Sequence, residues 1–191
     1  MQRRELLMAA GLAGLVPVAQ AADVESALRS GGLVLAFRHA LAPGNFDPPG
    51  FKLGMCSTQR NLSEEGRDQA RRMGAWFAAR RLQAIRVRSS PWCRCMDTAR
   101  LAFGDQAEGW AALGSPRAGS EETNAESLAL LRAALAAAVL KRGSFEVWVT
   151  HMFVFSALLG ENAGSGEGLL LGVNPDGSPR VIGRFTPAVL A

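Results

Sequence analysis

The chain has 191 residues, of which 48% are hydrophobic and 20% are charged, and its formal net charge is +4. This length suits a single domain, and the hydrophobic content excludes a disordered protein because enough apolar surface is present to form a core. The basic residues form no dense block and tyrosine is absent. We therefore expect no nucleic-acid partner, whereas binding of small anions is compatible with the charge.

The N-terminus is typical of an export signal. Two consecutive arginines precede an apolar run at 6–18, which is shorter than the roughly 20 residues that cross a bilayer. Small residues at 19–21 supply a cleavage site, so we expect a signal peptide at 1–21 and one mature domain at 22–191. The arginine pair also resembles a twin-arginine signal. The alternative is an uncleaved first helix; we expect a periplasmic or secreted protein without a membrane span after cleavage.

Three cysteines occur, at positions 56, 93 and 95. In an oxidising compartment one pair can close while one thiol is left over. Cys93 and Cys95 are too close for an easy mutual bridge, so we expect Cys56 to pair with Cys93 or Cys95, with Cys93 as the working partner. Three free buried cysteines are the alternative. The spacing is not that of a zinc site, so no metal is expected.

The residue pattern of the first half of the expected mature chain predicts, in order, a helix, a strand, a loop and a second helix. Residues 23–29 predict a short helix, and the apolar run 33–37 predicts a buried strand. The segment 40–60 is rich in proline and glycine and predicts a long loop, a kind of segment that is often functional. Ser63 is a typical N-cap, and the helix that it opens is expected to run to about Arg81.

The second half continues the alternation. Residues 104–123 have no clear period, and the expected elements around them are a strand at 85–89, a helix at 95–103, a helix at 124–142, a strand at 145–150, and a hairpin or edge strands at 168–173 and 181–185. This order predicts an α/β protein with three layers, α/β/α, and a largely parallel central sheet. Ligands of such sheets bind beyond the carboxyl ends of the strands.

The chain has two histidines, His39 and His151, and each follows a predicted buried strand directly. A single histidine is usually a satisfied core or loop residue, but two in equivalent places at one sheet edge favour a site. Arg38 precedes His39, and Arg94 lies between a strand end and a helix start. Guanidinium groups and free N–H groups at a helix start suit phosphate oxygens. The alternative makes both arginines surface residues paired with acids.

Three segments carry a family resemblance: LAFRHA at 35–40, SSPWCRCMDTAR at 89–100 and VTH at 149–151. They resemble the three signature segments of the histidine phosphatase superfamily, in its phosphoglycerate-mutase-like branch. The segment NLSEEGRDQA at 61–70 is similar to the helix that follows the first motif in that family. The resemblance spans most of the expected mature chain and implies a phosphoglycerate-mutase-like fold.

The resemblance implies that His39 is the nucleophile, which forms a transient phosphohistidine, and that Arg38, Arg94 and His151 hold the phosphoryl group. The chemistry agrees, because imidazole is substantially neutral and nucleophilic near pH 7. Positive groups around the equatorial oxygens stabilise the transition state, so no metal or cofactor is expected. Ala40 stands where the family usually has glycine, which requires a negative φ at this position.

The general acid, a carboxyl group that protonates the leaving oxygen, is left open by the sequence. Glu121 or Glu122, ahead of the long predicted helix, is the expected acid, although acids at helix starts also occur for dipole reasons. Asn45 and Asp47, on the loop after His39, are expected to touch substrate, with turn formation as the alternative. The remaining candidate acids are Asp105, Glu108, Glu126 and, more distantly, Glu167.

Together these features predict an exported, metal-independent phosphatase that hydrolyses a phosphomonoester through a phosphohistidine on His39. The resemblance suggests a small-molecule phosphomonoester, such as a sugar phosphate, or an envelope glycan phosphate as substrate. The alternative from another class is a catalytically silent phosphate- or glycan-binding module of the same fold. A mutase or a protein phosphohistidine phosphatase is less favoured, because export removes either from its usual cytoplasmic partners.

Overall fold

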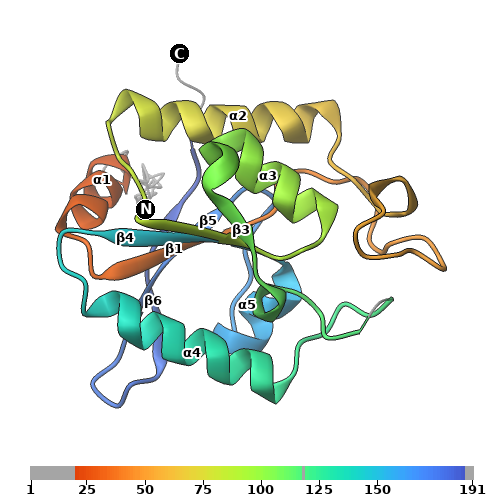
Figure 1. Ribbon diagram of the computed structural model, residues 1–191. Helices are drawn as coiled ribbons and strands as arrows, with labels where there is room; N and C mark the ends of the chain where they lie inside the picture. Colours follow the sequence, from red (N-terminus) through yellow and green to blue (C-terminus); the bar gives the residue numbers. More distant parts are fainter. Residues whose placement is uncertain (1–19, 118, 188–191) are drawn as a thin grey trace, which may run out of the picture.

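The structure, a computed structural model, describes residues 20–117 and 119–187. Within these ranges six strands form one sheet, in the order β3-β2-β4-β1-β5-β6 (Figure 1). Strands β1 to β4 run parallel to one another, whereas β5 is antiparallel to both of its neighbours, β1 and β6. The strands are β1 (Leu33–Arg38), β2 (Arg86–Ser89), β3 (Ala107–Gly109), β4 (Phe145–Thr150), β5 (Gly168–Val173) and β6 (Pro179–Phe185).

Helices cover both faces of the sheet, which confirms the predicted three-layer α/β/α architecture. Figure 1 shows α2 and α3 on one side of the sheet, and α4 and α5 on the other; α1 packs into the same core as α2 and α3. The helices are α1 (Gln20–Ser30), α2 (Glu64–Ala79), α3 (Cys93–Phe103), α4 (Ala125–Val139) and α5 (Met152–Leu159); single 3₁₀ turns lie at Cys56–Thr58, Gly104–Gln106 and Ala111–Leu113.

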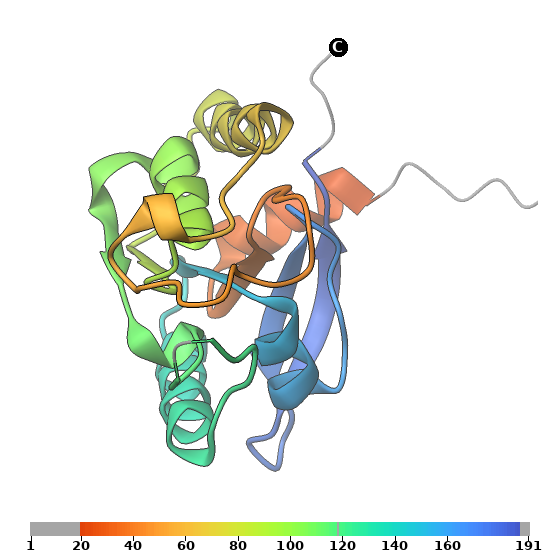
Figure 2. The ribbon, with the colours of Figure 1, turned by 90° about the vertical axis from the view of Figure 1, so that its right-hand side faces the viewer.

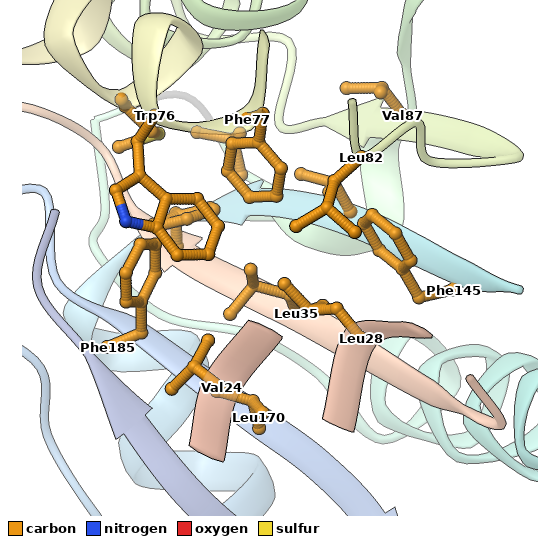
Figure 3. Packing of buried hydrophobic residues seen from close by; sticks show 14 of the residues in the cluster. Val24, Leu28, Leu35, Trp76, Phe77, Leu82, Val87, Phe145, Leu170 and Phe185 are labelled. Atoms are coloured by element: carbon orange, nitrogen blue, oxygen red, sulfur yellow. The ribbon is translucent and has the colours of Figure 1, made fainter. Parts of the chain in front are cut away.

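Strands β1 and β4 are central and buried on both faces, which explains why β1 is a continuous apolar run from Leu33 to Phe37 and why β4 is largely apolar, with Glu146 as its one charged residue. Alternate residues of β1 enter two different cores: Leu35 packs with α1 and α2, whereas Val34 packs with α4 and α5. Figure 3 shows the first core, where Trp76 and Phe77 of α2 lie over the sheet. The Trp76 ring lies 4.5 Å from that of Phe185, measured between centroids. This double burial fixes β1 firmly, and with it the residues that follow.

The loop after β1 is held against the start of α2. The Ser63 hydroxyl caps α2 by accepting the N–H of Gly66 at 3.1 Å. A Cβ on Gly66 would lie 2.0 Å from the carbonyl oxygen of Leu41, so only glycine permits this approach. The helix start therefore sets the path of the chain just after β1.

Most predicted elements are present with small changes of boundary. Helix α2 ends at Ala79 rather than near Arg81, α3 begins two residues earlier than predicted, and α4 ends at Val139 rather than at 142. Two elements were missed. Strand β3 has three residues and too few positions to show a period, and α5 is apolar at almost every position and so has no amphipathic pattern.

The predicted signal peptide falls almost wholly outside the described residues, since only its last two positions, at the start of α1, belong to them. Its cleavage and the domain boundary stay predictions. In the part of the chain that the structure describes, no helix is both long and apolar enough to cross a membrane.

Candidate functional site

The carboxyl ends of β1 and β4 bring the two histidines together, as the sheet rule predicts. His39 follows β1 and His151 follows β4, and their ring centroids lie 5.6 Å apart. The loop after β1 and the loop before α4 project from this side of the molecule, which faces the viewer in Figure 2. Both histidines are buried, at 2% exposure. The two loops and the carboxyl ends of the two strands therefore enclose the two imidazole rings.

Hydrogen bonds hold the backbone of His39 and of the residue that follows it. The His39 N–H donates to the carbonyl of Thr150 at 3.0 Å, and the His39 carbonyl accepts the N–H of Gly166 at 3.1 Å. The N–H of Ala40 donates to the Thr98 hydroxyl at 3.0 Å. Ala40 has a negative φ, so alanine is tolerated where the family usually has glycine. The imidazole thus stands on a rigid backbone.

The protonation of His39 follows from its partners. Its Nδ1 lies 2.8 Å from the carbonyl oxygen of Ala40, and a carbonyl can only accept, so Nδ1 carries the proton and Nε2 keeps a free lone pair. Burial lowers the pKa of His39 to about 3; the hydrogen bond to Ala40 opposes this shift, and the charges of Arg94, Arg60 and Arg38 add to it. His39 is therefore neutral near pH 7, with one nitrogen available as a nucleophile.

The ring of His151 is held by different partners. Arg94 Nη2 lies 3.3 Å from Nδ1, and since a guanidinium only donates, Nδ1 is the acceptor and Nε2 carries the proton. Nε2 then donates to the Ser90 hydroxyl at 2.7 Å. Burial lowers the pKa of His151 well below its ordinary value, with the charge of Arg94 acting in the same direction. His151 stacks on Phe153, at 4.9 Å between centroids, and is a fixed neutral group.

The depressed pKa of His39 predicts a loss of stability in acid. An unfolded histidine titrates near 6.5, so between about pH 6.5 and about pH 3 the unfolded chain binds more protons than the folded one. The contribution of neutral His39 is thus complete above the unfolded pKa and is lost as the pH falls toward the folded one. From about pH 7.5 to about pH 5 we expect the free energy of unfolding to fall by about 2 kcal/mol on account of His39.

Urea unfolding at the two pH values measures this effect. In His39→Gln, which keeps a polar side chain but does not titrate, the fall is expected to be smaller by about 2 kcal/mol. An equal fall in both proteins would mean that His39 is not held neutral by the fold.

Three arginines surround the histidine pair. Arg38 and Arg60 line the cavity described below, whereas Arg94 is fully buried behind it. Arg94 Nη1 donates to both carboxylate oxygens of Asp47, at 3.0 and 2.9 Å. Arg60 Nη1 donates to the carbonyl of Ala42 at 2.7 Å. Arg38 Nη1 donates to the carbonyl of Ala163 at 3.2 Å, so protein atoms hold each of the three guanidinium groups.

Arg60 was not predicted from the sequence. It ends the long loop after β1, where no period or motif sets it apart from other arginines. The available signal was its place directly before the family-like segment 61–70. Burial lowers the pKa of Arg60, and the neighbouring charge of Arg94 contributes to this shift. Two cations confined so close together favour an anionic ligand.

The two loop residues expected to touch substrate have different places. Asn45 lines the cavity. The Asp47 side chain, in contrast, is 5% exposed and turned inward. Besides Arg94, it accepts the indole N–H of Trp92 at 3.2 Å and the backbone N–H of Arg60 at 2.8 Å. Asp47 therefore orients two arginines and is not free to contact a substrate, because its oxygens are already used.

Of the candidate acids, Glu121 is the one that lies at the site. Its Oε1 is 3.4 Å from Arg94 Nη2 and 3.5 Å from Arg60 Nη2, and its side chain is 26% exposed. Glu122, the other expected acid, is exposed and pairs with Arg117 at 3.7 Å. The other candidates lie elsewhere: Asp105 in a 3₁₀ turn, Glu108 in β3, Glu126 in α4, and Glu167 paired with Arg184.

These side chains enclose a cavity of about 230 Å³. Its charged and imidazole-bearing walls are Arg38, His39, Arg60, Glu121 and His151, and the rest of its lining is Gly44, Asn45, Phe46 and Met152. Over the described ranges, no three His, Cys, Asp or Glu side chains are grouped so that they could hold a metal ion. The arrangement supplies a neutral imidazole beside guanidinium groups, which suits attack on a phosphoryl group.

Residues 54–114, from the long loop through α2, β2 and α3, match the family model of the histidine phosphatase superfamily (branch 1). This part of the chain, about a third of its length, is therefore similar to the histidine phosphatase superfamily. The matched segment contains both Arg60 and Arg94, and β1 and β4 supply the Arg-His pair and the second histidine that flank it in space. No curated protein matches the sequence significantly.

Several solved phosphatase structures share the fold. The protein histidine phosphatase SixA in complex with tungstate has a TM-score of 0.57 at 20% identity, covering 83% of this chain and 99% of its own. A phosphoserine phosphatase mutant from Entamoeba histolytica, in complex with phosphoserine, has a TM-score of 0.57 at 14% identity; the match covers 83% of this chain and 99% of the phosphatase. The alpha-ribazole phosphatase from Shigella flexneri has a TM-score of 0.57 at 13% identity; the match covers 83% of this chain and 98% of that phosphatase. At these identities the likeness establishes the fold.

A disulfide lies next to the site. Cys56, in the long loop, pairs with Cys93, the first residue of α3, and the working pair of the sequence prediction is the one observed. The Cys93 N–H also donates to the Gln59 side chain at 3.0 Å. The bridge fastens the loop that carries Arg60 to the helix start that carries Arg94. Cys95 remains a buried thiol, and burial raises its pKa to about 12.

Proposed function

We propose that the chain is an exported, metal-independent phosphatase that hydrolyses a phosphomonoester through a phosphohistidine on His39. The observation that carries this proposal is the state of His39, which lines the cavity as a neutral ring with Nδ1 engaged and Nε2 available. Around it, Arg38, Arg60 and Arg94 exceed in charge the two carboxylates of Asp47 and Glu121. The surplus positive charge is what a phosphoryl group requires.

The reaction then has two displacements. In the first, the Nε2 lone pair of His39 forms a bond to phosphorus while the bond from phosphorus to the leaving oxygen breaks. Glu121, which takes up a proton when the phosphomonoester binds, gives that proton to the leaving oxygen. In the second, water attacks phosphorus, its proton passes to the Glu121 carboxylate, and the bond from phosphorus to Nε2 breaks. Inorganic phosphate leaves, and both side chains return to their first state.

The arginines stabilise charge in both steps. Arg38 and Arg60 reach the cavity directly, and Arg94 lies behind it with Nη2 directed to His151 and Glu121. Because Asp47 fixes Arg94 in advance, little reorganisation is needed when charge builds on the equatorial oxygens. The chain's own groups thus supply the electrostatic stabilisation that phosphoryl transfer needs.

Export is supported by two features of this chain. The N-terminal sequence is typical of a signal peptide. The Cys56–Cys93 bridge is of a kind that persists in oxidising compartments such as the periplasm.

The role of Glu121 gives a selective prediction. An alkyl alcohol leaves poorly without a proton, whereas 4-nitrophenolate leaves without one. We expect Glu121→Gln to lower kcat for an alkyl phosphate by about 100-fold and to leave kcat for 4-nitrophenyl phosphate within a few fold of the wild-type value. Steady-state assays with EDTA present measure both substrates.

Glu122→Gln is the matched control, because Glu122 is adjacent in sequence and exposed; this variant is expected to keep both activities. Equal losses on both substrates in Glu121→Gln would remove Glu121 from the role of general acid. No turnover by folded wild-type protein, with inorganic phosphate still bound, would instead identify a phosphate-binding module.

A further inference from the structure

The entrance of the cavity carries large apolar side chains. Phe46, on the loop after β1, lines the cavity and is 75% exposed, and Met152, at the start of α5, lines it and is 44% exposed. Apolar groups left in water beside a polar site are typical of ligand contact. Asn45, next to Phe46, adds an amide to the same lining. The entrance therefore offers apolar surface from two elements and one hydrogen-bonding side chain.

The position of Phe46 is set by its neighbour. Asp47 is fixed by Arg94, Trp92 and the backbone of Arg60, as described above. A side chain on so firmly held a loop is presented to the entrance in advance, which lowers the entropic cost of using it for binding.

The size of the cavity decides where the rest of a substrate lies. At about 230 Å³ the cavity is smaller than the 300–1,000 Å³ typical of pockets that enclose a whole small molecule. With the phosphoryl group beside His39 and the arginines, the leaving group must extend past the entrance. There it meets Phe46 and Met152.

The charges of the cavity lining restrict the chemical class of the leaving group further. The cations that line the cavity are Arg38 and Arg60, and the mechanism uses both on the phosphoryl group. In the rest of the lining Glu121 is acidic, and no other residue outside the histidine pair can carry a charge. Nothing in this lining would pair with a second phosphate or a carboxylate on the leaving group.

From these observations we propose that Phe46 and Met152 form a platform for the leaving group, and that the substrate is an uncharged ring-bearing alcohol esterified with phosphate. The flat apolar face of the ring lies on Phe46, and Asn45 bonds a polar substituent. An aromatic ring and the C–H face of a sugar ring share this chemistry. The inference rests on the proposed function, because it places the phosphoryl group beside His39.

Binding of non-hydrolysable phosphonates tests the platform without depending on turnover. We expect the wild-type protein to bind benzylphosphonate more tightly than propylphosphonate in calorimetry. Phe46→Ala is expected to weaken benzylphosphonate binding by roughly tenfold and to leave propylphosphonate binding unchanged, whereas Phe46→Trp keeps the preference. Leu53→Ala is the control, since Leu53 is an exposed apolar residue of the same loop that does not line the cavity.

Turnover of benzyl phosphate, glucose 6-phosphate and propyl phosphate separates the two kinds of ring. If Phe46→Ala lowers kcat/KM for benzyl phosphate only, the leaving group is an aromatic alcohol. If it lowers kcat/KM for glucose 6-phosphate only, the leaving group is a sugar. In either case the change is expected in KM more than in kcat. Equal binding of both phosphonates by the wild type, or equal weakening of both in Phe46→Ala, would overturn the platform. Ring-selective binding without turnover of any ester would overturn the phosphatase and leave the platform standing.

Discussion

Replacing His39 by alanine is expected to lower kcat by on the order of 10⁴-fold or more, because the variant has no atom that can accept the phosphoryl group. The arginines stay in place, since Arg94 is held by Asp47 and Arg60 by the carbonyl of Ala42. The loss should therefore fall on chemistry and leave the binding of inorganic phosphate nearly intact. Hydrolysis of 4-nitrophenyl phosphate, with phosphate titrated by calorimetry in parallel, measures both.

His39→Gln is the companion variant, because it keeps a polar group of similar reach and removes only the nucleophile. It is expected to be as inactive as His39→Ala. Circular dichroism checks that both variants retain the fold. Residual turnover within tenfold of the wild-type rate in either folded variant would assign the nucleophile to another group.

Breaking the disulfide is expected to have the largest effect on stability among the changes considered. The bridge joins residues separated by 37 positions, and removing a cross-link over such a span costs about 3–4 kcal/mol through the entropy of the unfolded chain. Cys56→Ser should lower the free energy of unfolding by this amount in urea titrations. Activity should fall as well, because the bridge fastens the loop of Arg60 to the helix start of Arg94.

A reductant supplies the matched comparison. Under reducing conditions the wild-type protein should lose stability to the level of Cys56→Ser, and the variant should not change. Cys95→Ala, which removes a buried thiol outside the bridge, should respond to reductant as the wild type does. Equal stability of oxidised wild type and Cys56→Ser would show that the bridge does not contribute to the folded state.

The sequence was sufficient to predict the centre of the fold. Strands β1 and β4 are buried on both faces, so β1 appears as an uninterrupted apolar run and β4 as a largely apolar run interrupted by Glu146. The end of each run places a histidine at the carboxyl edge of the sheet, and the predicted meeting of His39 and His151 is confirmed. Ser63 marked the start of α2 because its hydroxyl satisfies a free N–H group of that helix.

The parts that the sequence did not predict depend on long-range contacts. Arg60 and Asp47 belong to an irregular loop, and their roles arise only when that loop folds against Arg94. The choice of Glu121 over Glu122 depends on which of two adjacent side chains turns toward the arginines, a property that no local pattern encodes. The position of Phe46 at the entrance likewise follows from how its neighbour is anchored.

Partners within the protein hold the arginines of the site in place. Asp47 pairs with Arg94, and the carbonyl of Ala42 accepts a hydrogen bond from Arg60, so neither buried guanidinium is an isolated charge. Glu121 bridges Arg60 and Arg94 where a phosphoryl oxygen could also be held. In the proposed mechanism a substrate therefore meets groups that are already oriented, with the carboxyl group of Glu121 beside the leaving oxygen.

The central claim is that His39 carries the phosphoryl group during turnover. The most direct measurement mixes the protein with excess 4-nitrophenyl phosphate, quenches in alkali, which preserves phosphohistidine, and locates the added phosphoryl group by peptide mass spectrometry. We expect it on the peptide that contains His39 in the wild-type protein, and on no peptide in His39→Ala. A phosphoryl group on His151, or rapid turnover with neither histidine ever modified, would contradict the mechanism.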